Sequence, residues 1–197
     1  SDILDQALHG KKLMLNDCIR LLKSDNPYAL GAIGNILRDK LFGKVATFVN
    51  NIILNYTNVC ITYCKFCAFY RAPGDSEGYT LSVDDIVKRV TTAKNHFGIS
   101  QVLMQGGHNP DLKVEYYEEA FKNIKEKCPD VAIHGLSASE IDTISKVEKI
   151  STKEVLSRLK EAGLDSLPGA GAEILDDDVK SKISPLKIKS NEWINIM

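Results

Sequence analysis

The alternation of short apolar runs with amphipathic segments constrains the fold of this chain more than any other feature. Apolar runs start near residues 52, 100, 131 and 164. Helical periodicity fills the intervals, over about residues 82–97, 114–127, 139–147 and 151–162. Repeated strand–helix units of this size imply a parallel sheet with helices outside it. The chain is therefore expected to be an α/β protein with about four βα units.

The residues before this alternation carry only helical periodicity. Asn26-Pro27 interrupts it, and Gly43 ends the last of these helices. We expect residues 1–42 to form a helical cap on the sheet and residues 43–197 to form the α/β domain. Two β-rich runs, Val45–Val49 and Ile52–Tyr56, are predicted to begin that domain.

Charge and hydropathy exclude several classes of function. Lys and Arg number 25 against 26 Asp and Glu, so the net charge is -1 and there is no basic excess for nucleic acid. No apolar run approaches the ~20 residues that span a bilayer, and the first residues do not resemble a signal peptide. We expect a cytoplasmic protein that binds neither nucleic acid nor membrane.

Three of the five cysteines form a motif. Cys60, Cys64 and Cys67 lie at C-x3-C-x2-C spacing just after the run 52–56. A structural zinc site needs four ligands, and no second Cys/His pair accompanies these three. An iron–sulfur cluster bound by three thiolates would instead leave one iron open for another ligand. Packed thiols or an incomplete zinc site remain the alternative, and Cys18 and Cys128 are predicted to be non-ligating.

The cysteine motif, with Phe66 before its last cysteine, resembles that of the radical S-adenosylmethionine (SAM) enzymes. The resemblance implies a partial (β/α)6 barrel with the motif after the first strand. It also implies a 4Fe–4S cluster held by Cys60, Cys64 and Cys67, and SAM bound beside Phe66. The longer strings NYTNVCITYCKFCAFYRAPG, LMQGGHNPDLKVEYYEE and EVLSRLKEAGLDSLPGAGAEIL resemble the branch that serves the futalosine route to menaquinone.

That branch implies a reaction. A 5′-deoxyadenosyl radical would abstract hydrogen from ribose C4′ of dehypoxanthine futalosine, and the carbon radical would attack the benzoate ring. Loss of an electron and a proton from the resulting cyclic radical would then give the product. An electron donor such as flavodoxin or ferredoxin would serve the cluster. Aminofutalosine synthase and the deazaflavin (F0) synthase partner subunit are the alternatives within the branch. A metal-binding interaction protein without catalysis is the alternative outside it.

The resemblance also implies roles for residues at the strand ends. Gln105, Gly106 and Gly107 would hold the SAM amino group through their backbone, unless they form an ordinary βα turn. Ser137 would contact SAM or cap a helix. Glu173 would bind a ribose hydroxyl or the sulfonium side of SAM, or help to remove a proton, or else start a helix as a dipole-stabilised carboxylate.

Two residues after the cysteine motif are candidates for substrate binding. Tyr70 and Arg71 directly follow the motif loop, and an arginine there could pair with the substrate benzoate bidentately. A solvated loop charge is the alternative for Arg71.

The number of βα units bears on the extent of the chain. Four units are expected here, whereas the resemblance implies six, and Trp193, Ile194 and Met197 are spaced like one face of a helix that is just beginning. The sequence therefore predicts a fragment of a longer protein. An open sheet edge and a bare inner wall would then cause self-association.

Overall fold

The computed structural model describes residues 2–197. These residues form two compact units, one ending at Phe48 and one comprising Val49–Met197. The boundary expected after residue 42 lies six residues before this division and stays a prediction. The packing of the first unit on the sheet as a cap stays a prediction.

The first unit is helical, as expected. It contains α1 (Asp2–Leu8), α2 (Leu15–Leu22) and α3 (Pro27–Phe42). The side chain of Asn26 accepts a hydrogen bond from the Ala29 amide at 3.0 Å and caps α3, with Pro27 at the first helical position. Lys40 donates to the Leu8 carbonyl at 3.0 Å and links α3 to α1.

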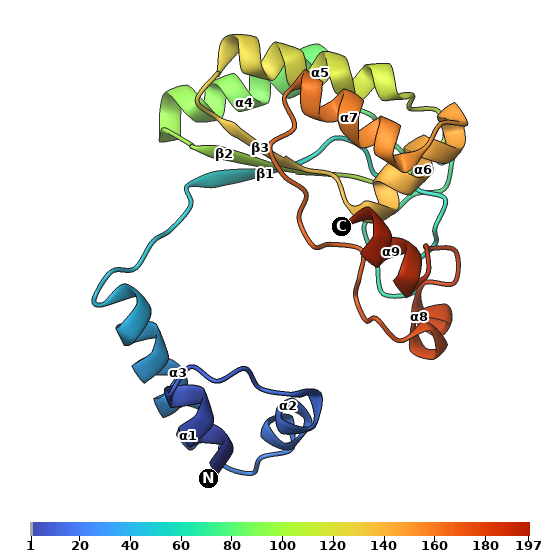
Figure 1. Cartoon of the computed structure of the whole chain (residues 1–197). Coiled ribbons are helices and arrows are strands. Elements are labelled where there is room, and N and C mark those ends of the chain that lie inside the picture. Colours follow the sequence, from blue (N-terminus) through green and yellow to red (C-terminus); the bar gives the residue numbers. More distant parts are fainter. Residues whose placement is uncertain (1) are drawn as a thin grey trace. The chain divides into compact units, whose positions relative to one another are not determined.

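The second unit is a three-stranded parallel sheet with its helices (Figure 1). Its strands are β1 (Asn51–Asn55), β2 (Gln101–Gln105) and β3 (Ala132–Gly135), paired in chain order so that Leu54, Met104 and Gly135 lie in one row. Its helices are α4 (Val83–Phe97), α5 (Val114–Lys127), α6 (Ala138–Glu148), α7 (Thr152–Ala162), α8 (Asp177–Ile183) and α9 (Ser190–Ile196).

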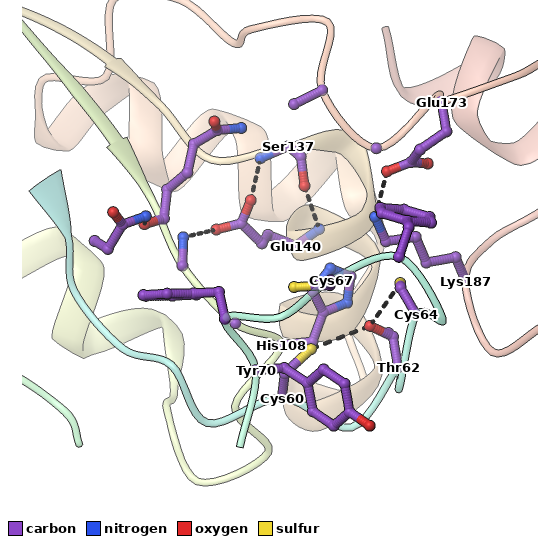
Figure 2. Close-up of a pocket in the computed structure, with 18 residues that line it drawn as sticks. Cys60, Thr62, Cys64, Cys67, Tyr70, His108, Ser137, Glu140, Glu173 and Lys187 are labelled. Atoms are coloured by element: carbon purple, nitrogen blue, oxygen red, sulfur yellow. Dashed lines mark hydrogen bonds and ion pairs between the residues drawn. The ribbon is translucent and has the colours of Figure 1, made fainter. Parts of the chain in front are cut away.

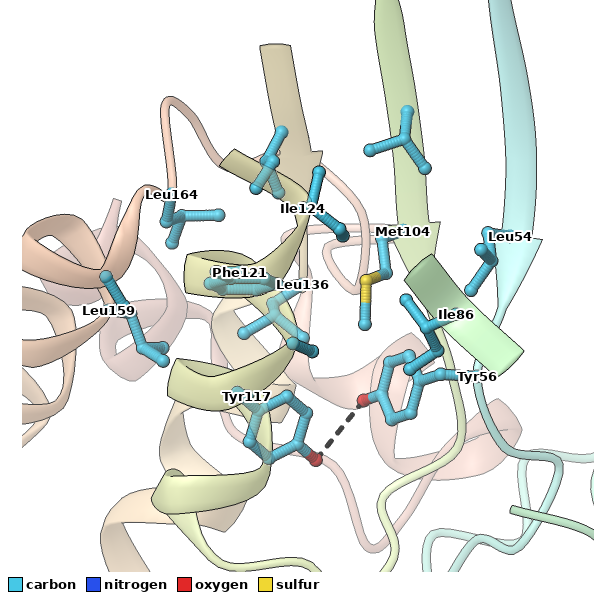
Figure 3. Close-up of a cluster of buried hydrophobic side chains, with 14 of the residues drawn as sticks. Leu54, Tyr56, Ile86, Met104, Tyr117, Phe121, Ile124, Leu136, Leu159 and Leu164 are labelled. Carbon is cyan, nitrogen blue, oxygen red and sulfur yellow. Dashed lines mark hydrogen bonds between the residues drawn. The ribbon is translucent and has the colours of Figure 1, made fainter. Parts of the chain in front are cut away.

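The hydrophobic core lies between the sheet and α4, α5 and α7, which cover one face of it (Figures 1 and 3). Strand residues that face these helices are buried, among them Leu54, Met104 and Ile133. Alternate strand residues point to the other face, where Ile53 is 69% exposed. A parallel sheet with helices on one face is the arrangement of a partial β/α barrel, whose interior is the other face.

The helix boundaries follow the sequence signals closely. Ser82 and Ser151 accept hydrogen bonds from the third amide of α4 and α7, at 3.1 Å each. The Ser151 backbone amide donates no bond to the Glu154 side chain among the bonds of α7, so only half of a capping box forms there. A complete box forms at α6 instead, with Ser137 as its first residue.

Two of the expected strands are absent from the described residues. Residues 45–49 pair with no strand, and their side chains include Phe48, which is 91% exposed. Residues 164–167 contribute a single bridge, between Ser166 and His134 of β3. The Ile133 amide donates a hydrogen bond to the Asp165 carboxylate at 2.7 Å. A fourth strand would need this amide as a donor to one of its backbone carbonyls, and the side chain of Asp165 occupies it instead. Pro168, which lacks an N–H group, then follows.

The end of the chain contains two short helices. α9 confirms the helical spacing of Trp193 and Ile194, whereas α8 has no counterpart among the sequence predictions. Within residues 2–197, no helix combines the length and the apolar character needed to cross a bilayer.

Candidate active site

One pocket lies at the carboxyl ends of the three strands (Figure 2). In parallel α/β sheets this edge is where active sites assemble. Its walls come from the ends of β1 and β2, the motif loop, the start of α6 and the two segments that precede and follow α8. The lining residues are Asn55, Cys60, Thr62, Cys64, Phe66, Cys67, Phe69, Tyr70, Gln105, Gly106, Gly107, His108, Ser137, Glu140, Ala170, Gly171, Glu173 and Lys187.

The three motif cysteines meet in this pocket. Cys60 and Cys64 are buried, Cys67 is partly exposed, and all are free thiols. The other two cysteines lie elsewhere: Cys18 is exposed on α2, and Cys128 is buried at the end of α5. Neither of them lines the pocket, and ligation by the trio alone stays a prediction.

Backbone hydrogen bonds hold the motif loop against its surroundings. The Cys60 amide donates to the Arg71 carbonyl at 2.9 Å, and the Ile61 amide donates to the His108 carbonyl at 3.1 Å. The Lys65 amide donates to the Ile183 carbonyl at the end of α8, at 2.8 Å. The loop is therefore fixed by contacts far away in the sequence, and the positions of its thiols depend on the tertiary fold.

Gly106 and Gly107 are needed for close packing. A Cβ atom on Gly107 would lie 2.1 Å from the Val59 carbonyl oxygen, and one on Gly106 would lie 2.7 Å from the Tyr56 ring. The Gly106 amide is engaged by Glu140 at 3.0 Å, and the Gly107 amide donates to the Thr57 carbonyl at 2.9 Å. The absence of side chains at these glycines thus lets the turn after β2 pack against the start of the motif loop. This packing requires glycine independently of any contact with a ligand.

Glu140 connects the ends of all three strands beneath the pocket. Its carboxylate accepts hydrogen bonds from the Tyr56 hydroxyl at 2.7 Å, the Gly106 amide at 3.0 Å and the Ser137 amide at 2.6 Å. Burial raises the pKa of Glu140, although these hydrogen bonds oppose the shift. Burial and the neighbouring Glu140 likewise raise the pKa of Tyr56, whose hydroxyl accepts from Tyr117 at 3.4 Å (Figure 3).

Sequence reasoning missed Glu140 although a signal was present. Ser137 and Glu140 have the spacing of a capping box, and Ser137 does accept from the Glu140 amide at 3.2 Å. Ser137 is therefore a helix cap that also lines the pocket.

His108 lines the pocket as a neutral imidazole. The single hydroxyl proton of Thr143 is donated to the Ser139 carbonyl at 3.0 Å. The 2.9 Å contact between Thr143 Oγ1 and His108 Nδ1 therefore requires a proton on Nδ1. Burial, together with the charges of Lys187 and Lys146, lowers the pKa of His108 to about 3. The imidazole is thus neutral, and Nε2 is its hydrogen-bond acceptor.

Glu173 and Lys187 form an ion pair in the wall of the pocket. Lys187 Nζ lies 2.6 Å from Glu173 Oε1, and 5.8 Å from the centre of the Phe66 ring in the motif loop. Glu173 has a φ of 47°, a conformation that side-chain-bearing residues rarely adopt. It does not start a helix, since α8 begins at Asp177, so that alternative is wrong. No sequence signal pointed to Lys187.

The two candidate substrate residues are separated. Tyr70 lines the pocket, and its ring packs edge-on against Tyr63. Arg71 is not among the lining residues: its guanidinium pairs with Glu77 at 2.6 Å and donates to the Tyr70 carbonyl at 3.0 Å. In this arrangement, Arg71 is therefore not placed to contact a substrate carboxylate in the pocket.

The donor set of the pocket fits an iron–sulfur cluster. Three sulfur atoms from one loop are the ligands that such clusters use. An adjacent buried hydroxyl, that of Thr62, has the thiols of Cys60 and Cys64 as its partners. No three His, Cys, Asp or Glu side chains of residues 2–197 gather closely enough to hold a single metal ion.

Comparisons with known proteins agree with this chemistry. The family model described as "Radical SAM superfamily" matches residues 54–197. The chain is 44% identical over 196 residues to a cyclic dehypoxanthine futalosine synthase of Halalkalibacterium halodurans, covering 99% of this chain and 53% of that protein. It is 38% identical over 172 residues to a 5-amino-6-(D-ribitylamino)uracil–L-tyrosine 4-hydroxyphenyl transferase of Methanopyrus kandleri, covering 87% of this chain and 46% of that protein.

The chain spans about half the length of these relatives. Among solved structures, it resembles a methylornithine synthase with a TM-score of 0.68 at 19% sequence identity, over 98% of this chain and 54% of the other. That likeness supports the partial β/α barrel. The family match extends over most of the chain and includes the cysteine motif, so this chain belongs to the Radical SAM superfamily.

Proposed function

We propose that this chain acts in the cyclisation of dehypoxanthine futalosine in menaquinone biosynthesis. The observation that carries the proposal is the convergence of Cys60, Cys64 and Cys67 in one pocket with the ends of β2 and β3. The identity of 44% to a synthase of that name supports this choice of substrate.

The three cysteines would hold a 4Fe–4S cluster, and SAM would occupy the rest of the pocket. Radical SAM enzymes use this pair of cofactors, which supplies hydrogen-atom abstraction when bound. Phe66, Gln105, Gly106, Gly107 and Ser137 line the pocket and are the proposed SAM-binding residues; Glu173 joins them as a candidate for a ribose hydroxyl or for proton removal.

This chain's own residues would orient the ligand and exclude water. The motif loop, fixed by its backbone bonds, would hold the thiolates in place, and Glu140 would keep the ends of the strands together. Tyr70 would contact the substrate, and Arg71 would do so only after leaving Glu77. A cytoplasmic location and a donor such as flavodoxin or ferredoxin belong to the same proposal, and self-association stays a prediction.

A second function is favoured by a specific observation. The identity of 38% to the 4-hydroxyphenyl transferase covers 87% of the chain, so the same pocket could serve that reaction class. The deazaflavin alternative from the sequence belongs to this class, and aminofutalosine synthase remains a further alternative.

A substrate panel separates these candidates. The full-length protein, reconstituted anaerobically, is given SAM and reductant with dehypoxanthine futalosine, with enolpyruvyl benzoate, or with L-tyrosine and 5-amino-6-(D-ribitylamino)uracil. Cyclic product from the first substrate alone supports the proposal. Turnover of either of the others overturns the named substrate, and a protein that binds no iron overturns the cluster assignment.

A further inference from the structure

Thr62 lies between two of the pocket cysteines. Its hydroxyl is 3.1 Å from Cys60 Sγ and 3.6 Å from Cys64 Sγ (Figure 2). The residue is 4% exposed. Within residues 2–197, it is the only side chain that hydrogen-bonds a thiol of this pocket.

The partners of this hydroxyl are unusual for a buried threonine. Buried hydroxyls normally donate to oxygen or nitrogen, as the partly buried Thr143 does to the Ser139 carbonyl. Thr62 makes no such bond among the described residues; its hydroxyl has only the two sulfur atoms. A neutral thiol is a weak acceptor, so the thiol form of the site leaves this hydroxyl poorly satisfied.

The arrangement becomes favourable when the sulfur atoms carry negative charge. Hydrogen bonds to an ionised acceptor are about twice as strong as those between neutral groups. Metal ligation requires the thiolate form of cysteine. The hydroxyl is thus placed to interact well with the ligated state of the cysteines and poorly with the thiol state.

We propose that Thr62 donates a hydrogen bond to the thiolate of Cys60 or Cys64 and thereby raises the reduction potential of the cluster. Reduction adds an electron to the cluster and its thiolates, and the donated proton stabilises the more negative state more than the less negative one. Hydrogen bonds to the sulfurs are one of the determinants of cluster potential. The inference rests on the proposed ligation by the three cysteines.

The test is a redox titration of the reconstituted full-length protein and its variants, followed by the electron paramagnetic resonance signal of the reduced cluster. Thr62→Val keeps the shape of the side chain and removes the hydroxyl. We expect the ratio of reduced to oxidised cluster at a fixed potential to fall about tenfold, a shift of about 59 mV for one electron. Thr62→Ser keeps a hydroxyl, so its reduction potential should lie close to that of the unmodified protein.

A matched control is present in the same chain. Thr91 Oγ1 lies 3.8 Å from the sulfur of Cys128, a threonine–cysteine contact outside the pocket. Thr91→Val should leave the potential unchanged, which separates a local effect from a general loss of packing. Iron and sulfide content, measured for every variant, shows whether each protein carries a full cluster.

The outcomes are distinguishable. If the unmodified protein binds no cluster, the proposed function fails. If it binds one, and Thr62→Val takes up the same iron with an unchanged potential, the inference about Thr62 is wrong while the proposed function stands. If Thr62→Val fails to assemble a cluster, the comparison of Thr62→Ser with the unmodified protein decides: a Ser variant that loads iron but titrates about 59 mV below the unmodified protein, although it keeps a hydroxyl, would contradict the inference.

Discussion

Replacing Glu140 by glutamine should destabilise the second unit measurably. The carboxylate is fully buried and accepts three bonds from three separate segments, through Tyr56, Gly106 and Ser137. Glutamine has nearly the same shape but only one acceptor oxygen. At best that oxygen keeps the bonds of Tyr56 and Gly106, and the amide nitrogen then faces the Ser137 N–H.

The magnitude follows from that count. One hydrogen bond to a charged group, worth about 1.5–3 kcal/mol, is lost, and a buried N–H is left unpaired. Replacing the carboxylate also removes a buried charge, which offsets part of this loss of stability. Burial disfavours the ionised carboxylate, as its raised pKa shows. We expect a net loss of about 2 kcal/mol, or roughly 4–8 °C in melting temperature for a chain of this size.

The assay is urea unfolding of the metal-free, reduced protein, with Glu154→Gln as the control. Glu154 follows Ser151 as Glu140 follows Ser137, but it is exposed and α7 lacks the reciprocal bond, so its replacement should cost under about 0.5 kcal/mol. A loss for Glu140→Gln as small as that of the control would refute the view that this carboxylate ties the strand ends together.

A pH series gives the same experiment a second readout. The folded-state pKa of Glu140 lies above the ordinary value of 4.5, so the folded protein binds this proton more tightly than the unfolded chain does. The stability that Glu140 contributes is therefore complete below about pH 4.5 and decreases as the pH rises towards the folded pKa. Glutamine does not titrate. The difference in free energy of unfolding between the unmodified protein and Glu140→Gln should therefore decrease as the pH rises from about 4.5 towards the folded pKa.

Three further predictions concern other parts of the pocket. Cys67→Ala should abolish iron binding, whereas Cys128→Ala, which removes a buried thiol outside the pocket, should retain it; loss of iron in the Cys128 variant would contradict the three-ligand site. The lowered pKa of His108, about 3, means that metal-free protein should lose up to about 1.4 kcal/mol of stability per pH unit as the pH falls from 6.5 towards 3, since only the unfolded state takes up this proton. A His108→Asn variant should lack that component, and an identical pH slope in both proteins would show that the histidine is not buried in its neutral form. For Lys187 and Glu173, whose side chains are 12% and 21% exposed, a double-mutant cycle of Lys187→Met with Glu173→Gln should give a coupling energy of about 1–2 kcal/mol by chemical denaturation; a value near zero would mean that the pair is broken in solution.

Local sequence determined most of the helices and the position of the motif. Capping serines such as Ser82, helix-ending glycines such as Gly98 and apolar periodicity act through neighbours within a turn or two, so they can be read without the fold. The cysteine spacing likewise indicated sulfur-based metal chemistry, because ligand type and ligand number are properties of the sequence.

Strand pairing was harder to predict from the sequence than the helices were. The run 45–49 has the composition of a strand but no partner, and residues 164–167 meet β3 at one bridge because the Asp165 side chain occupies the Ile133 amide. Strand propensity describes how a segment fits a sheet surface, and whether a neighbouring strand is available depends on residues far along the chain.

The environment of the pocket was decided by the tertiary structure alone. Arg71 looked free to meet a carboxylate, yet it pairs with Glu77, while Lys187, which had no sequence signal, lies in the wall beside Phe66. Glu140 followed a recognisable helix-capping pattern, but its bonds to Tyr56 and Gly106 join residues brought together from other strands. Charge pairs and buried hydrogen bonds form between groups that are close in space. The sequence therefore identifies the reactive residues, and the fold selects the partners that set their charge, orientation and access to a ligand.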